Sequence, residues 1–274
     1  MPNLPATKQS EPKLRIESLH KSFSIGGKRE PVLAGVDLAV GPGDFVSIIG
    51  PSGCGKSTLL NIIAGLDQPD SGSVSLNDGD GSQDQPRLGR VGYMQQKDLL
   101  LPWRTVLDNT ILGLELNGVS RRQARIRALE LTESFGLSGF EDLYPYALSG
   151  GMRQRAAFLR TMLLGHETIL LDEPFGALDA LTRIEMQEWL LNLWDSMNST
   201  IVLITHDVDE AILMSDRVYV LTSRPGKVKM ILDVDLPRPR DFEAVTSPPF
   251  TSLKARLLAA LREEKGKVGA DTWP

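Results

Sequence analysis

The strongest signal in this sequence is a glycine-rich segment that consists of Gly50, Pro51, Ser52, Gly53, Cys54, Gly55, Lys56, Ser57 and Thr58. The segment fits the pattern G-x-x-x-x-G-K-[ST], in which glycines let successive backbone N–H groups point at phosphate oxygens. An apolar run at residues 44–49 precedes it, and a stretch with helical spacing at residues 57–64 follows it. Because this pattern requires a strand before it and a helix after it, the sequence predicts a nucleotide-binding site here.

Three side chains of this segment have distinct expectations. Lys56 is expected to reach the β- and γ-phosphates, and the Ser57 hydroxyl is expected to ligate Mg²⁺. Cys54 occupies a position that the pattern leaves open, so it is interpreted as a passive small residue, although nearby donors would lower the pKa of its thiol. The alternative for the whole segment is a glycine-rich turn with a surface lysine.

Composition narrows the class of protein. The chain has 274 residues, of which 41% are hydrophobic and 24% charged, which is ordinary for a globular protein. The net charge of −5 disfavours a nucleic-acid binder. A single cysteine excludes an intramolecular disulfide framework and indicates the cytosol. No run of 18 apolar residues occurs, and residues 1–12 do not resemble a secretory signal, so we expect neither a spanning helix nor a signal peptide.

Strand-like and helical stretches alternate along the chain. The strand-like runs begin at Leu14 and recur at residues 44–49, 168–171, 200–205 and 217–222. Helical spacing occupies most of the rest, which predicts an α/β fold with a buried, mostly parallel sheet. We expect a disordered tail at residues 1–12, a main domain at residues 13–240 with a helical insert at about 97–164, and a helical C-terminal extension at residues 241–274.

Some local features carry more specific expectations. Residues 77–86 are predicted to form a polar loop. Asp207 and Glu210 are predicted to cap a helix. An amphipathic helix with a leucine stripe is predicted to pack on its own chain rather than on a membrane; the stripe is Leu253, Leu257, Leu258 and Leu261. Another stripe is predicted for the helix that Ser120 and Gln123 begin; it consists of Ala124, Ala128, Leu131 and Phe135.

Two carboxylates follow the apolar run at residues 168–171. In a parallel sheet, this strand would deliver Asp172 beside the Mg²⁺ of the glycine-rich segment. Glu173 follows directly and would polarise a water molecule as a general base. Alone, an acidic pair after a strand is more often a helix start, so the hypothesis depends on the glycine-rich segment in the same chain.

A second phosphate-binding pattern occurs at residues 148–154, with the sequence L-S-G-G-M-R-Q. The plain interpretation is a helix entry with Ser149 as N-cap. Ser149, Gly150 and Gly151 at a helix N-terminus would also bind phosphate. Since one nucleotide does not need two such sites from one subunit, we expect this one to meet the nucleotide of another copy.

Together these motifs resemble those of ABC-transporter ATP-binding subunits. The resemblance covers about residues 14–235 and rests on residues 50–58, 148–155, 169–174, 176–179 and 205–207, in the order that the family has them. A finer resemblance is to the nitrate, sulfonate, taurine and bicarbonate import branch. It rests on residues 100–103 (L-L-P-W), 144–145, 224–226 (R-P-G) and 236–240 (L-P-R-P-R).

The resemblance implies roles for further residues. Gln96, rather than Gln95, would link the γ-phosphate and Mg²⁺ to the helical insert, because the family keeps a fixed spacing to Leu-Pro-Trp. Asp179 would lie at a dimer interface, and His206 would contact the γ-phosphate. Phe23 would stack on adenine; the alternative is a core aromatic. The segment that contacts the partner's nucleotide would comprise Ser149, Gly150, Gly151 and Gln154.

The resemblance also implies a fold, cofactors and partners. The fold is a P-loop NTPase with a RecA-like core, an antiparallel β piece and an inserted helical subdomain. The cofactors are ATP and Mg²⁺, with Ser57, Gln96 and Asp172 at the metal and Lys56, Gln96, Glu173 and His206 in hydrolysis. The partners are a second copy or a related ATPase subunit, membrane permeases as separate chains, and a separate solute-binding protein. The subunit would lie at the cytoplasmic side of the membrane and energise solute import.

Other functions are less consistent with the sequence. A GTPase would carry an N-K-x-D string, which does not occur. A DNA-repair ATPase of the same superfamily would be expected to carry long coiled coils or a zinc-binding cysteine set. A non-catalytic binding module would be expected to lack Glu173 or His206. The basic cluster is interpreted as a solvated helix face; it consists of Arg121, Arg122, Arg125 and Arg127.

Overall fold

The structure is a computed structural model, and it describes residues 11–77, 86–195 and 199–270, with the side chains of residues 265–270 excepted. The predicted disordered tail lies almost entirely outside the described residues, as does most of the predicted polar loop at residues 77–86. Within the described ranges no helix is long and apolar enough to cross a membrane.

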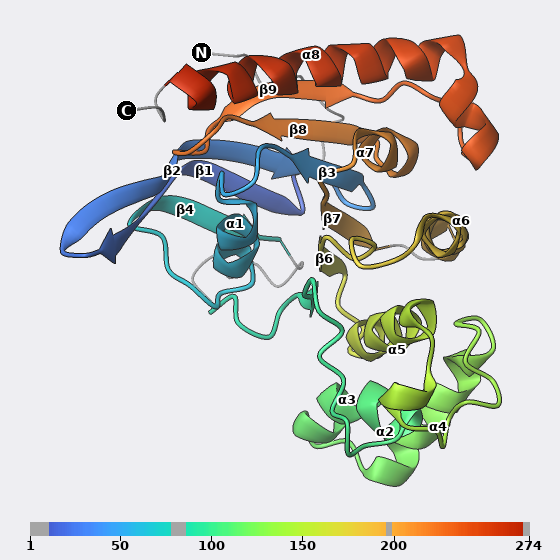
Figure 1. Cartoon of the computed structure of the whole chain (residues 1–274). Helices are drawn as coiled ribbons and strands as arrows, with labels where there is room; N and C mark the ends of the chain where they lie inside the picture. The colour runs from blue at the N-terminus through green and yellow to red at the C-terminus, as the bar shows by residue number, and fades with distance from the viewer. Residues whose placement is uncertain (1–10, 78–85, 196–198, 271–274) are drawn as a thin grey trace.

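Among the described residues, six strands form the main sheet, in the order β5-β6-β7-β3-β8-β9 (Figure 1). All neighbours pair in parallel except β8 and β9. Their bounds are β3 (Phe45–Ile49), β5 (Gly92–Met94), β6 (Thr168–Asp172), β7 (Thr200–Ile204), β8 (Arg217–Leu221) and β9 (Val228–Asp233). Every residue of β3, β6 and β7 is buried, because both faces of the sheet are covered. The predicted mostly parallel sheet is therefore confirmed.

A smaller antiparallel sheet lies against one face of the main sheet. Its strand order is β2-β1-β4, with β1 (Leu14–Ile25), β2 (Lys28–Val40) and β4 (Ser71–Leu76). Helix α1 (Lys56–Ile63) contributes Leu59, Leu60, Ile62 and Ile63 to a core shared with both sheets. The helix that follows the glycine-rich segment is thus held by apolar packing on several sides.

Helices cover the other face of the main sheet. They are α5 (Gly150–Met162), α6 (Ala180–Asp195), α7 (Val208–Met214) and α8 (Pro248–Ala270). Successive residues of β6 face opposite sides: Ile169 and Leu171 join the core under these helices, whereas Leu170 joins the core of α1. This alternation explains why the strand reads as one apolar run in the sequence.

Three short helices form a lobe at the far side of α5 (Figure 1). They are α2 (Val106–Thr110), α3 (Leu112–Leu116) and α4 (Arg121–Thr132), and the 3₁₀ turn η1 (Pro145–Ala147) precedes α5. The lobe has its own small core, which consists of Leu107, Ile111, Leu114, Ala124 and Ala128. A parallel core sheet, an antiparallel piece and an inserted helical lobe together confirm the predicted fold class.

Helix α4 departs from the predicted stripe at one position. Ser120 caps the helix by accepting from the Gln123 backbone N–H, as expected. Leu131, predicted on the same face as Ala124 and Ala128, is 36% exposed. The helix ends at Thr132, so Phe135 lies beyond it and does not belong to the same helical face.

The C-terminal segment packs on the main domain. Phe250 and Leu257 of α8 are fully buried in the core beneath α7, and Leu253, Leu258 and Leu261 are packed against it. The leucine stripe therefore packs on its own chain, as predicted. The 3₁₀ turn η2 (Phe242–Thr246) joins α8 to the preceding segment.

Arg240 holds the start of this segment against α7. Its guanidinium group is buried and donates to five backbone carbonyls, those of Ile212, Leu213, Ser215, Val234 and Leu236. Three of these carbonyls lie at the C-terminal end of α7, where helical carbonyls lack partners of their own. Burial lowers the pKa of Arg240 to about 10, which leaves the group charged at neutral pH.

Leu257→Ala tests whether α8 belongs to the main fold. Removing a fully buried leucine side chain leaves a cavity, so we expect the free energy of unfolding to fall by about 2–5 kcal/mol. Denaturant unfolding of the purified protein measures it. Leu129→Ala, at an exposed position of α4, is the control and should change stability by less than about 0.5 kcal/mol. Equal stability of the two variants would show that α8 is an independent appendage.

Candidate functional site

The glycine-rich segment lies between the end of β3 and the start of α1. Gly55 has φ 105°, and a Cβ atom there would lie 2.7 Å from the Leu33 side chain, so this turn requires glycine. Lys56 is buried, and its ammonium group donates to the carbonyls of Gly50 at 2.9 Å and Pro51 at 3.1 Å. The Lys56 side chain therefore folds back over its own loop, and the backbone carbonyls at the start of the loop hold its ammonium group.

A segment from the other end of the chain closes against this loop. A Cβ atom on Gly226 would lie 2.3 Å from the Cys54 carbonyl oxygen. The Gly226 backbone also bridges to β2, donating to Val32 and accepting from Ala34. The R-P-G string at residues 224–226 thus supports the phosphate loop, a contact that the sequence analysis did not foresee.

Cys54 is buried within the loop. Burial raises the pKa of its thiol, even though the Lys56 charge acts in the opposite direction. The hypothesis that nearby donors lower this pKa is therefore wrong. A neutral thiol in this position agrees with the interpretation of Cys54 as a passive small residue.

Asp172 ends β6 beside the start of α1. Burial raises the pKa of its carboxyl group and Glu173 adds to the effect, while Ser57 and Lys56 oppose it. In the free protein, the favourable interactions of the Asp172 carboxylate with Ser57 and Lys56 therefore do not fully offset the cost of burying its charge, which leaves the carboxylate undercompensated. Burial and the nearby Asp172 also raise the pKa of Tyr93, whose hydroxyl donates to Asn61 at 3.1 Å.

The residues around Asp172 suit Mg²⁺. In the part of the chain that the structure describes, no group of three or more His, Cys, Asp and Glu residues could hold a metal by itself. Mg²⁺ does not need such a group, because it is commonly held by one or two protein oxygen ligands together with phosphate oxygens and water. The Ser57 hydroxyl and an undercompensated Asp172 carboxylate fit that donor set.

Two side chains from different segments meet at Glu173. The Gln96 side-chain amide, which follows β5, donates to Glu173 Oε2 at 3.2 Å. His206 Nδ1, which follows β7, lies 3.3 Å from the same oxygen. Glu173 itself has φ 46°, in the left-handed region that non-glycine residues rarely occupy. Strain of this kind persists where the surroundings fix it, and it is common at functional sites.

The Ser149 segment lies outside this cluster. Ser149 is the N-cap of α5 and accepts from the Met152 backbone N–H at 3.3 Å. Asp179 accepts from Thr182 in the first turn of α6, and this contact holds the pKa of Asp179 below its usual range. Among the described residues, neither Ser149 nor Asp179 forms a hydrogen bond with the glycine-rich segment, Glu173 or His206. Gly150, Gly151 and Gln154 follow Ser149 on α5.

Phe23 lies on β1 at the surface of the small sheet. Its side chain is 39% exposed, so the alternative of a core aromatic is wrong. The Lys21 ammonium group lies 5.0 Å from the ring centroid. An exposed aromatic face next to a cation is available to stack against a planar ligand.

The loop after Gln96 is fastened to helix α5. Asp98 accepts from Arg153 at 3.2 Å, and the carbonyls of Asp98 and Leu99 accept from Arg160 at 2.6 Å and 2.8 Å. Because Ser149 caps the start of α5, these arginines connect the Gln96 loop to the second phosphate-binding pattern. Arg153 belongs to the string at residues 148–154, but its contact with Asp98 was not predicted, and no local pattern marks Arg160.

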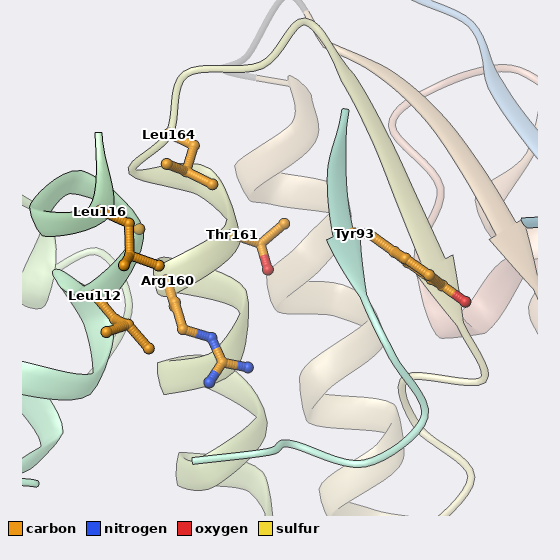
Figure 2. Close-up of a pocket in the computed structure, with 7 residues that line it drawn as sticks. Tyr93, Leu112, Leu116, Arg160, Thr161 and Leu164 are labelled. Carbon is orange, nitrogen blue, oxygen red and sulfur yellow. The ribbon is translucent and has the colours of Figure 1, made fainter. Parts of the chain in front are cut away.

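A pocket of about 160 Å³ lies beside this connection. Figure 2 shows Leu112 and Leu116 of α3 facing Leu164 at the end of α5, with Arg160 below them. Tyr93 lines the opposite side, and its ring points away from the leucines (Figure 2). The pocket is mainly apolar and lies between the helical lobe and the main sheet.

Glu210 does not play the predicted role. Asp207 caps α7 as expected, accepting from the backbone N–H groups of Asp209 and Glu210. The Glu210 side chain does not cap; it is buried and accepts from the Thr205 hydroxyl at 2.9 Å. Its position in the first turn suggested a cap, and only the packing of α7 on the sheet shows where the side chain lies.

Comparison with known proteins gives relatives over most of the chain. The formylaminopyrimidine import ATP-binding protein ThiZ of Halalkalibacterium halodurans is 42% identical over 85% of this chain and 91% of its own length. The nitrate import ATP-binding protein NrtC of Synechococcus elongatus is 43% identical over 92% of this chain, which spans 38% of that longer protein. The nitrate relative confirms the resemblance to the import branch.

Solved structures and a family profile agree with these relatives. A dimeric ATP-binding cassette, MJ0796, in a post-hydrolysis state bound to ADP and Pi, has a TM-score of 0.69 and 31% identity. The match covers 82% of this chain and all of that one. The profile described as ABC transporter matches residues 33–176. The chain therefore belongs to the ABC transporter family and is an ATP hydrolase of that family.

Proposed function

We propose that this chain is the ATP-hydrolysing subunit of an import system whose membrane permeases are separate chains. The observation that carries the proposal is the convergence of Gln96 and His206 on Glu173 beside the phosphate loop. The subunit would lie at the cytoplasmic side of the membrane. Import, rather than another ABC activity, is supported by the names of both relatives described above.

Hydrolysis in this site requires placement and charge neutralisation more than covalent chemistry. Lys56 would hold the β- and γ-phosphates, and Ser57, Asp172 and Gln96 would hold Mg²⁺. When bound, Mg²⁺ would neutralise part of the negative charge of the phosphates. Glu173 accepts a proton from the attacking water, and His206, from the end of β7, contacts the γ-phosphate. Phe23 would stack on the adenine ring.

The active unit is proposed to be a dimer. Ser149, Gly150, Gly151 and Gln154 are not brought to the Lys56 loop of their own chain. Ser149 is exposed at this helix N-terminus, whereas Gly151 and Gln154 are buried. An exposed N-terminal cap of this kind suits the phosphate of a nucleotide bound by a second copy or by a related ATPase subunit. Asp179, exposed at the start of α6, would lie at this interface. The dimeric state of the MJ0796 cassette supports the arrangement.

The permeases are proposed to bind near the loop that follows Gln96. Trp103 is 72% exposed and Leu99 is 50% exposed, and both lie close in sequence to Gln96. The apolar pocket between α3 and α5 is lined by Arg160, which donates to the Leu99 carbonyl of this loop. Arg153 and Arg160 fix this loop on α5, so force on the loop would reach Ser149.

The solute is proposed to be a small anion such as nitrate, a sulfonate, taurine or bicarbonate, delivered by a separate solute-binding protein. The alternative is another small molecule, since the relatives of similar identity include a formylaminopyrimidine import protein. An uptake assay after deletion of the gene distinguishes these. Loss of nitrate or sulfonate uptake supports the anion, and loss of another solute alone overturns it.

Glu173→Gln should bind MgATP with nearly unchanged affinity and hydrolyse it about 10²–10⁴-fold more slowly, because general-base assistance acts mainly in the transition state. Phosphate release and nucleotide titration measure the two quantities. ATP-bound dimers should accumulate in size-exclusion chromatography. Glu243→Gln, on η2, is the matched control. Turnover at the wild-type rate would refute the assignment of Glu173.

Trp103→Ala should reduce solute uptake while sparing basal ATPase activity, since Trp103 is exposed and outside the cluster around Glu173. Uptake in cells and ATPase activity of the isolated subunit are compared. Phe242→Ala, an exposed aromatic on η2, is the control and should change neither. If crosslinkers placed at residues 99–104 never capture a permease in assembled complexes, the proposed surface is wrong.

Mixing two inactive variants tests the composite site. Lys56→Ala damages the phosphate loop, and Ser149→Arg damages the helix N-terminus. In a mixed dimer one site receives both defects and the other receives none, so ATP-dependent dimerisation should recover. Size-exclusion chromatography with ATP measures it. If both motifs instead served the nucleotide of one chain, mixing would rescue nothing, and failure of mixed dimers under conditions where the wild type dimerises would exclude the trans arrangement.

A further inference from the structure

A buried carboxyl group that takes no part in the proposed chemistry is hydrogen-bonded to Thr205, the residue before His206. Glu210, in the first turn of α7, is 5% exposed. Its Oε2 accepts from the Thr205 hydroxyl at 2.9 Å. Its Oε1 is also buried and has no hydrogen-bond partner among the described residues. Burying a carboxyl group is costly, and no cation forms an ion pair with it within the described ranges.

The Thr205 hydroxyl connects Glu210 to the backbone around His206. While it donates to Glu210, it also accepts from the Asp207 backbone N–H at 3.0 Å. The Asp207 carboxylate in turn holds the first turn of α7, including the Glu210 backbone N–H at 3.2 Å. His206 lies between the two residues that this closed set of bonds fixes. Its side chain is 60% exposed, so the imidazole has little packing of its own.

The position of the imidazole is therefore set mainly by its backbone. Thr205 is anchored on the sheet side through its N–H to the Ile48 carbonyl. On the helix side, the anchor is the contact between Thr205 and Glu210. Without an acceptor at Glu210, the Thr205 hydroxyl would be a buried donor without a partner, which is unfavourable. Reorientation of that hydroxyl would also release the Asp207 N–H.

We propose that Glu210 is a positioning residue for ATP hydrolysis: through Thr205 it holds the His206 imidazole against Glu173. The inference rests on the role given to His206 in the proposed function. Glu210 would thus contribute to hydrolysis itself, whereas the sequence predicted only a helix-capping role for it.

The charge state of Glu210 follows from its surroundings. Burial raises its pKa to about 8, and the negative charges of Asp207 and Glu173 add to the rise. The Thr205 hydrogen bond and Arg183, on α6, act in the opposite direction. Glu210 is therefore mainly protonated at neutral pH. Above about pH 8 it gains a negative charge close to Glu173, which would weaken the site.

A double-mutant cycle tests the positioning role. In the wild-type background, Glu210→Leu should lower kcat by up to about 10²-fold, the cost of misplacing one reacting group. In a His206→Ala background, the same change should lower kcat by less than about 2-fold, because the group that Glu210 positions is absent. A purely structural role of Glu210 would produce equal losses in both backgrounds. MgATP affinity and thermal unfolding are measured alongside kcat.

Two further variants keep the inference testable if Glu210→Leu does not fold. Thr205→Val removes the bridging hydroxyl at nearly constant volume and should reproduce the loss in kcat and its dependence on His206. Glu210→Gln keeps an acceptor for Thr205 without a titrating group. It should retain activity at pH 7 and lack the fall in kcat that the wild type shows above about pH 8. Asp209→Asn, in the same helical turn, is the control and should leave kcat unchanged.

The outcomes separate this inference from the proposed function. If His206→Ala itself leaves kcat unchanged, the role of His206 fails and the inference fails with it. If His206→Ala lowers kcat but Glu210→Leu and Thr205→Val cost the same in both backgrounds, only the inference is overturned. A pH profile of Glu210→Gln identical to that of the wild type would also overturn the pH dependence assigned to Glu210.

Discussion

The site depends on one constraint, which is that three parallel strands end at the same level of the main sheet. Asp172 of β6 pairs with Ile204 of β7, and Ile48 of β3 pairs with the same Ile204. Each strand is followed directly by a reactive segment: the phosphate loop after β3, Glu173 after β6 and His206 after β7. Because parallel strands expose their carboxyl ends at one edge, side chains that follow different strands, such as Glu173 and His206, come within 3.3 Å of each other.

Several residues at this edge of the sheet adopt arrangements that are energetically unfavourable in the free protein. Lys56 is folded onto backbone carbonyls, Asp172 is buried with incomplete compensation, and Glu173 adopts a left-handed backbone conformation. The surrounding core is rigid enough to hold them, since β3, β6 and β7 are buried along their whole length. A phosphate group with its cation would relieve the first two costs, so the arrangement favours binding over the free state.

Contacts far from the edge connect it to the rest of the molecule. Arg153 and Arg160 fasten the Gln96 loop to α5, and Arg240 fastens the C-terminal segment to the end of α7. In both places, arginine guanidinium groups donate hydrogen bonds to backbone carbonyls or, for Arg153, to the Asp98 carboxylate as well. A planar group with several N–H donors is suited to such multiple contacts. Movements of α5 and α7 are therefore tied to elements that lie outside the nucleotide site.

The sequence by itself determined the parts whose signal is local. The spacing of the phosphate loop, the apolar runs of the buried strands and the order of the motifs were sufficient for the fold class and for the family, because each is a property of neighbouring residues. Only the tertiary structure decided which side chains meet. Gln96 contacts Glu173, Glu210 turns inward to Thr205 instead of capping its helix, and Gly226 closes on Cys54. These contacts join separate elements through packing, and no pattern along the chain encodes the distance between them.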